Sequence, residues 1–379
     1  MQRRYLEGLI LVVWCVVLLV GAKFVSRVFV PLPDAPRWRG FHVADSLAAY
    51  RLAPNLDGKI YFFGNVHIRT NRLGLRDREY GPRIPGVKRV LMLGDSQTLG
   101  LVEERNTLPR RLEHELERRD ENWEVINAGV LGYGPEQELI RLRWLLPIYH
   151  PDLVVLTIFA NDVYDSRYRP NERWYVGDDG YLHSRTEPSV TPAEPHTALR
   201  RALNWTLWHV NLANLAWKAA GRAKAAISGE ATPRPAKDPD YARLQARDWD
   251  AQEKHDWARA ESLIVEIAAT ARAGGAEILF VDGGSRAAVS WKMWPATVDT
   301  SRYDLDQETR LLSAAAARAR APCVHVLDAF RASRSPEALY FPNDDHWTPR
   351  ANALVASMLA PVVRIAVRGT GPDPHLSTR

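Results

Sequence analysis

The chain has 379 residues, a length typical of two domains or of one with insertions, and its 46% hydrophobic and 25% charged residues allow a large core and exclude global disorder. The net charge of +5, from 50 Lys and Arg against 45 Asp and Glu, is spread along the chain without a basic block, which argues against nucleic-acid binding. The two cysteines, Cys15 and Cys323, lie far apart in apolar runs, which excludes a disulfide framework and a cysteine metal site.

The first predicted element is an uncharged apolar run from Gly8 to Ala22. At 1.5 Å per residue it spans roughly 22 Å, and apolar neighbours extend it to about 20 residues, close to what a hydrocarbon core requires. The run continues into Phe24-Val25 without a polar region, which favours an uncleaved anchor over a signal peptide cleaved after Ala22. Residues 1–29 are therefore predicted to be a membrane anchor, with a signal peptide as the alternative. Basic residues flank both ends, so charge does not set the orientation, and we expect the remaining chain to be periplasmic or extracellular.

Residues 30–85 are predicted to form a β-rich preamble, with a hairpin of 59–63 and 66–70 around Gly64-Asn65. From 86 to 370 apolar runs alternate with helical patterns. Five runs are predicted as strands, at 89–93, 125–126, 152–159, 278–281 and 324–327. Helices are predicted after Thr107, over 136–149, before the fourth and fifth strands, and from about Thr348. This alternation predicts an α/β fold, a three-layer α/β/α sandwich with a parallel sheet.

An insertion at about 166–245 is predicted within this domain, and 371–379 is a tail. Residues 199–226 are a helix candidate carrying Trp205, Trp208 and Trp217 among basic side chains. An amphipathic helix packed on the domain is the favoured interpretation, and a lid or membrane-surface helix is the alternative. The Pro-rich stretch 228–240 is predicted to be a linker.

Polar motifs follow the first three predicted strands and precede the last helix. Ser96 comes directly after the first strand, where open α/β folds bind ligands and where backbone N–H groups can stabilise an oxyanion. Gly132 lies in the glycine-rich segment after the second strand, and Asn161 follows the third. His346 has carboxylates one and two residues before it, as a base oriented by an acid requires. Each motif alone is typical of a turn, a helix cap or a surface loop, but their combination indicates one catalytic site.

Over residues 87–367 these motifs resemble those of the SGNH (GDSL-type) hydrolases. The matching segments are GDSQTLG, NAGVLGYG, FAND and DDHW, and the preceding TNRLGLRDRE is similar to what stands before the serine motif in bacterial membrane-associated members. The resemblance implies that Ser96 is the nucleophile and that its N–H is one oxyanion donor. Gly132 is implied as the second donor, with Gly129 in reserve, Asn161 as the third, and His346 as the general base.

The chain departs from the family pattern at two positions. Phe159 replaces the usual glycine of the asparagine motif, which should narrow the site. Asn343 stands where the family usually has an aspartate, three residues before the histidine. Asp344 provides an Asp-x-His spacing instead, as in alginate-type O-acetyltransferases, and is taken as the triad acid, whereas Asp345 is expected to be exposed.

The resemblance implies a serine esterase that acts on acyl esters, in the first place acetyl esters, of an envelope or extracellular glycan. The alternative is a membrane-anchored polysaccharide O-acetyltransferase, which needs a membrane protein that supplies acyl groups. A third hypothesis is a catalytically silent glycan-binding or assembly protein, which has no need of the complete residue set. No metal cluster or nucleotide-binding loop is evident, so neither a metal nor a cofactor is expected.

Overall fold

A computed structural model of the chain describes residues 40–62, 65–118, 122–186, 242–294, 298–342 and 344–368, together with isolated positions before residue 22. The chain divides into two compact units, and the unit comprising 37–59, 66–188 and 236–379 contains the central sheet. Apart from the isolated positions, the predicted anchor lies outside the described residues. So do the tryptophan-bearing helix candidate, the Pro-rich stretch and the tail.

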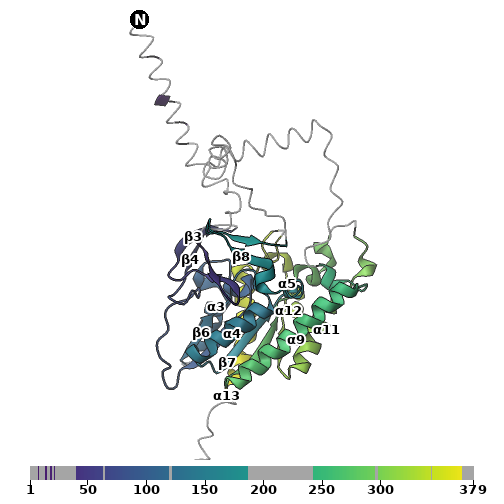
Figure 1. Ribbon diagram of the computed structural model, residues 1–379. Helices are drawn as coiled ribbons and strands as arrows, with labels where there is room; N and C mark the ends of the chain where they lie inside the picture. Colours follow the sequence, from purple (N-terminus) through teal and green to yellow (C-terminus); the bar gives the residue numbers. More distant parts are fainter. Residues whose placement is uncertain are drawn as a thin grey trace, which may run out of the picture. The chain divides into compact units, whose positions relative to one another are not determined.

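A parallel five-stranded sheet forms the centre of this unit (Figure 1). Its strands are β5 (Lys88–Leu93), β6 (Trp123–Asn127), β7 (Leu153–Ile158), β10 (Glu277–Asp282) and β11 (Cys323–His325). They are arranged in the order β11-β10-β7-β5-β6, so the direction of winding reverses between β5 and β7. In open α/β sheets ligands bind at the carboxyl ends of the strands at such a switch point.

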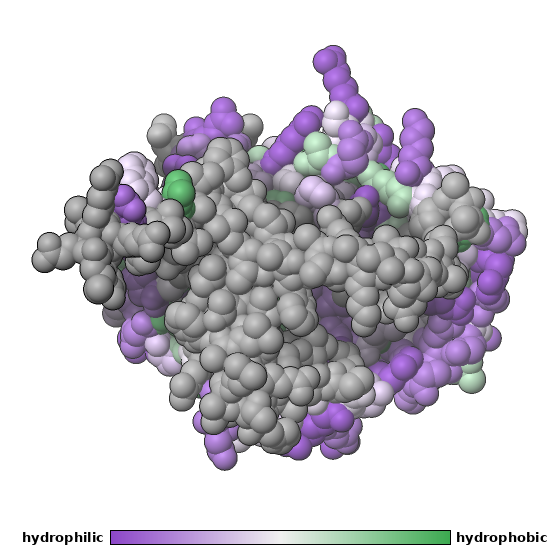
Figure 2. All heavy atoms as spheres, turned by 90° about the horizontal axis from the view of Figure 1, so that it is seen from above, coloured by the Kyte–Doolittle hydropathy of each residue, from purple (hydrophilic) through white to green (hydrophobic). Residues whose placement is uncertain are grey.

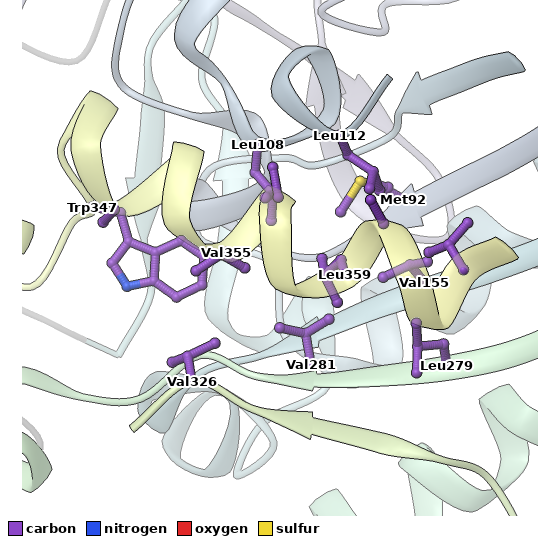
Figure 3. Close-up of a cluster of buried hydrophobic side chains, with 14 of the residues drawn as sticks. Met92, Leu108, Leu112, Val155, Leu279, Val281, Val326, Trp347, Val355 and Leu359 are labelled. Atoms are coloured by element: carbon purple, nitrogen blue, oxygen red, sulfur yellow. The ribbon is translucent and has the colours of Figure 1, made fainter. Parts of the chain in front are cut away.

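Helices cover both faces of the sheet, which explains why β7 is buried along its whole length. On one face α3 (Leu108–Glu117) and α13 (Pro349–Arg368) pack against the strands, and Figure 3 shows α13 side chains beside those of the sheet. On the other face lie α4 (Pro135–Tyr149), α9 (Ala251–Ala273) and α11 (Gln307–Arg318) (Figure 1). The predicted three-layer α/β/α arrangement is therefore confirmed for the described residues.

The five sheet strands lie close to their predicted positions, with one correction. The fifth strand is shorter than predicted, because the chain turns into α12 (Leu327–Arg331). The predicted helix after Thr107 is α3, with Pro109 in its first turn and Leu108, Leu112 and Leu116 fully buried. Pro has no N–H to leave unpaired at this position, which suits the first turn of a helix.

The β-rich preamble contains two two-stranded sheets. These are β1 (His42–Asp45) with β2 (Ala49–Leu52), and β3 (Asp57–Tyr61) with β4 (Asn65–Arg69). The second pair is the predicted hairpin, shifted toward the N-terminus by one to two residues, whereas the first was not predicted. The β1–β2 pair belongs to the same compact unit as the central sheet, and the Tyr50 hydroxyl donates to the Leu131 carbonyl (2.8 Å) in the loop after β6.

Short elements complete the described chain. They are α2 (Ser96–Leu99), η1 (Glu104–Asn106), α5 (Ala160–Asp165), α6 (Pro170–Arg173), β8 (Trp174–Val176), β9 (Leu182–Ser184), η2 (Ala242–Gln245), α10 (Arg286–Val289), η3 (Trp291–Met293), η4 (Thr300–Arg302) and η5 (Pro336–Leu339). The α6, β8, β9 and η2 elements belong to the predicted insertion. On the face drawn in Figure 2 the visible described residues are mostly hydrophilic. This is expected because most apolar side chains are buried in the two clusters that cover the faces of the central sheet.

Among the described residues, one helix is long and apolar enough to cross a membrane, at Pro349–Val367 within α13. Half of its most apolar window is buried within the protein. Val355 and Leu359 belong to the same core cluster as Val281 and Leu279 of β10 (Figure 3). These contacts are those of a core helix of an α/β domain.

Candidate active site

The first polar motif folds into a sharp strand-to-helix connection at the switch point. The chain leaves β5 through Gly94, and the Asp95 side chain caps α2 by accepting from the Gln97 N–H (2.8 Å). Ser96 is thereby the first residue of α2. The first N–H groups of a helix have no partner within it, so the Ser96 N–H is available to a ligand.

The structure brings Ser96, His346 and Asp344 together although 250 residues separate the first two. The Ser96 Oγ lies 2.8 Å from His346 Nε2, and His346 Nδ1 lies 2.7 Å from Asp344 Oδ1. Asp344 Oδ1 also accepts from the backbone N–H of His346 (2.7 Å), so the carboxylate fixes both the ring and the main chain. This is the geometry of a nucleophile, a base and an orienting acid.

The two consecutive aspartates of the last motif have different partners. Burial alone would raise the pKa of Asp344, but the hydrogen bonds from His346, together with the charge interactions with His346 and Arg286, outweigh it and hold that pKa below its usual range. An ionised Asp344 is the form that stabilises an imidazolium. Asp345, which was expected to be exposed, is half-buried, and its Oδ1 accepts from the Arg286 N–H (2.9 Å). That expectation was wrong because the start of α10 reaches this side chain.

Two glycines compete for the second oxyanion donor, and the structure separates them. Gly129 packs against α2 so closely that a Cβ there would lie 2.3 Å from the Leu99 nitrogen, and its N–H donates to Asn127 Oδ1 (3.1 Å). Gly132 has φ +73°, a conformation that favours glycine, and within the described residues its N–H has no hydrogen-bond partner. This geometry favours Gly132 over Gly129 as the candidate donor.

Asn161 lies in the first turn of α5, directly after β7, and hydrogen bonds to buried carboxyl groups orient its side chain. Its Nδ2 donates to Asp165 Oδ2 (2.9 Å), and Asp165 forms an ion pair with Arg173 of α6. The Asn161 side chain also hydrogen-bonds Asp95, so two buried carboxyl groups orient this amide. Asp165 and Arg173 belong to no motif, and no sequence pattern could have identified them as partners of Asn161.

Ser96, Gly132, Asn161 and His346 all line one cavity of about 460 Å³. Phe159, the residue that departs from the family pattern, lines it as well. The remaining walls are Asp95, Gln97, Leu131, Tyr164, Asp165, Arg173, Trp174, Asp344 and Asp345. The cavity therefore combines aromatic walls with several polar groups.

Further carboxyl groups are buried around this cavity. Burial raises the pKa of Asp95, Glu138, Asp162 and Asp165, and mutual repulsion adds to the shift at the last three. Neither oxygen of Glu138 has a hydrogen-bond partner among the described residues. Burial therefore disfavours the ionised form of each of these four carboxyl groups.

Comparison with known proteins gave structural matches alone. No family model and no curated protein matches the sequence. The matching solved structures include TesA, with 14% identity over 74% of this chain and 99% of that one and a TM-score of 0.42. They also include the esterase EstA from Pseudoalteromonas sp., with 12% identity over 74% and 99% and a TM-score of 0.40. A GDSL-like lipase from Bacteroides thetaiotaomicron has 13% identity over 75% and 89%, with a TM-score of 0.34. At 12–14% identity and TM-scores of 0.34–0.42, these matches establish nothing about the function of this chain.

Proposed function

We propose that the protein is a serine esterase of the SGNH type that cleaves acyl esters through an acyl-enzyme. The observation that carries this proposal is the alignment of Ser96 Oγ, His346 Nε2 and Asp344 Oδ1, at 2.8 Å and 2.7 Å, at the edge of a cavity. A binding protein has no need of a serine that is hydrogen-bonded to an oriented histidine.

In the first step Ser96 Oγ attacks the ester carbonyl carbon while His346 Nε2 takes the hydroxyl proton. Asp344 stabilises the resulting imidazolium through Nδ1. The carbonyl oxygen becomes an oxyanion, for which the N–H groups of Ser96 and Gly132 and the Asn161 amide are the donors. His346 then gives its proton to the leaving alcohol, and the acyl group stays on Ser96. Removal of one oxyanion donor typically costs about 10²–10³ in kcat.

The second step depends on which hydroxyl attacks the acyl-enzyme. With water, His346 again acts as base and the products are a carboxylic acid and free enzyme. With a sugar hydroxyl, the same step transfers the acyl group. The Asp344-x-His346 spacing resembles that of alginate-type O-acetyltransferases. Acyl transfer to a sugar hydroxyl is therefore the second candidate function.

For the substrate we propose an acyl ester, in the first place an acetyl ester, of an envelope or extracellular glycan. The modest cavity, with Phe159 at its wall, suits a short acyl group, and its polar and aromatic lining suits a carbohydrate. The apolar run at 8–22 supports a membrane location with the catalytic domain periplasmic or extracellular. A transferase would in addition require a membrane partner that supplies the acyl group.

The test uses the full-length chain with p-nitrophenyl acetate and with a serine-reactive phosphonate. Wild type should hydrolyse the ester and carry the adduct on Ser96, and Ser96→Ala should do neither. Ser313 offers a matched control, because its Oγ lies 3.0 Å from His325 Nε2, and His325 Nδ1 lies 2.9 Å from Asp282 Oδ2. Ser313 is exposed in the middle of α11, where the backbone N–H groups are used within the helix, so Ser313→Ala should keep full activity.

Wild-type turnover by Ser96→Ala would contradict the proposal. Hydrolysis and transfer are distinguished by incubating wild type with an acyl donor and an oligosaccharide. Free acid indicates an esterase, and an acylated oligosaccharide indicates a transferase.

A further inference from the structure

Gln97, directly after the serine, binds the backbone on both sides of the histidine. Its Nε2 donates to the carbonyl of Asp345 (2.7 Å), and its Oε1 accepts from the N–H of Trp347 (3.1 Å). Gln97 is 3% exposed. The Gln97 amide therefore binds the backbone on either side of His346, and Gln97 itself belongs to α2, the helix that begins with Ser96.

The loop that Gln97 holds has little regular structure of its own. His346 lies between η5 and α13, and the bridge between Tyr340 and Trp347 is an isolated one. The His346 carbonyl accepts from the Phe341 N–H (3.1 Å), and the Asp345 carboxylate accepts from the Arg286 N–H. These bonds fix the loop to itself and to α10, whereas the bonds of Gln97 fix it to α2.

We propose that Gln97 is a positioning residue that sets the distance between Ser96 Oγ and His346 Nε2; this inference rests on the proposed function of Ser96 and His346. A single hydroxyl–imidazole hydrogen bond cannot by itself hold two elements in register, since it must break and re-form in each turnover. The two bonds of Gln97 are made to backbone atoms and persist throughout the reaction. A misplacement of about 1 Å can cost about 10²-fold in rate, so loss of this contact should lower kcat rather than substrate affinity.

The first variant is Gln97→Leu, which keeps the volume and removes both hydrogen bonds. In the full-length chain we expect kcat for p-nitrophenyl acetate to fall by about 10- to 100-fold, with KM changed by less than about twofold. The rate of covalent modification of Ser96 by the phosphonate should fall in parallel. The matched control is Gln307→Leu, because the Gln307 amide also joins two backbone groups, the carbonyls of Leu244 (3.0 Å) and Ala246 (2.7 Å). It should lower stability while leaving kcat and the labelling rate unchanged.

The second variant, Gln97→Glu, provides a signature that a loss of packing does not produce. A protonated carboxyl can donate to the Asp345 carbonyl and accept from the Trp347 N–H, as the amide does, whereas the ionised form can only accept. The labelling rate of Gln97→Glu, divided by that of wild type at the same pH, should therefore rise as the pH falls through the pKa of the introduced carboxyl. The same ratio for Gln97→Leu should be independent of pH.

The outcomes separate the inference from the proposed function. If Ser96→Ala is inactive but Gln97→Leu has wild-type kcat and labelling rate, Gln97 does not position the pair and the inference is wrong. If Gln97→Leu does not fold, the inference is tested with Gln97→Glu alone. A labelling rate of Gln97→Glu that keeps the same ratio to wild type at every pH would overturn the inference. If wild type forms no adduct at Ser96, the proposed function fails and the inference fails with it.

Discussion

At the scale of single residues, the two consecutive carboxylates of the last motif differ in their partners. Asp344 Oδ1 accepts from His346 twice, from the ring and from the backbone, whereas Asp345 Oδ1 accepts from the Arg286 N–H. An Asp-Asp-His sequence alone cannot assign the acid, because neighbouring residues of a loop point in different directions. The hydrogen bonds therefore favour Asp344 over Asp345 as the proposed orienting acid.

Asp344→Asn should lower kcat for p-nitrophenyl acetate by roughly 10³–10⁴-fold, because a neutral amide stabilises neither the correct tautomer nor the imidazolium. Asp345→Asn is the matched change, since an amide oxygen can still accept from the Arg286 N–H. It should cost no more than a few-fold. Steady-state kinetics of both variants decide between the two acids, and an equal loss in both would contradict the assignment.

At the scale of elements, α6 of the predicted insertion is connected to the site through side chains. Arg173 of α6 pairs with Asp165 at the end of α5, and Asp165 accepts from Asn161 in the first turn of the same helix. The guanidinium also lies over the Trp174 ring, 4.9 Å from its centroid. The described start of the insertion therefore contributes to the orientation of Asn161, which we propose as an oxyanion donor.

Asp165→Ala should lower kcat by about tenfold in a chain that retains Asn161, because the amide loses one of the hydrogen bonds that orient it. In an Asn161→Ala background the same change should have no further effect on kcat, since the oriented group is absent. This double-mutant cycle measures the coupling free energy of the two side chains. Additive losses would show that Asp165 acts through something other than Asn161.

The packing of α13 in the core can be tested by mutation, because the helix carries apolar residues both on its buried face and on its exposed face. Leu359 is fully buried, whereas Ile365 is 73% exposed. Leu359→Ala should lower the free energy of unfolding by about 2–5 kcal/mol, because it leaves a cavity against β10. Ile365→Ala should change it by less than about 0.5 kcal/mol. Denaturant unfolding of both variants is the measurement, and equal effects would argue against the observed packing.

At the scale of the whole molecule, the sheet and the convergence of the candidate site residues could be predicted from the sequence because both depend on local patterns. Apolar runs such as 89–93 and 152–159 predicted strands, and the carboxyl ends of parallel strands meet at one edge. The contacts of Gln97 with residues 345 and 347 could not be predicted in this way, since they join segments about 250 positions apart and belong to no periodic pattern. The β1–β2 pair was missed because its short strands have no clear alternation.

Buried carboxyl groups also give the whole molecule a pH dependence of stability. Burial, with repulsion from Asp282, raises the pKa of Glu308 to about 8, and burial raises the pKa of Asp77 to about 6. An acid with a raised pKa binds its proton more strongly in the folded chain than in the unfolded chain. Its contribution to stability is fully present below the unfolded pKa and is lost as the pH rises through the folded one. For Glu308 that range runs from its ordinary value of 4.5 to about 8.

The Tm of wild type should therefore fall between pH 5 and pH 8, and Glu308→Gln should reduce that fall by roughly several degrees. An amide at this position cannot ionise, yet its oxygen can still accept from the Ser285 hydroxyl, which lies 2.7 Å from Glu308 Oε2. Glu277→Gln is the control, because Glu277 is exposed at the start of β10 and should leave the slope of Tm against pH unchanged. Thermal unfolding of the three proteins across this range is the measurement. Parallel slopes in all three would mean that Glu308 ionises in the folded chain as readily as in the unfolded one.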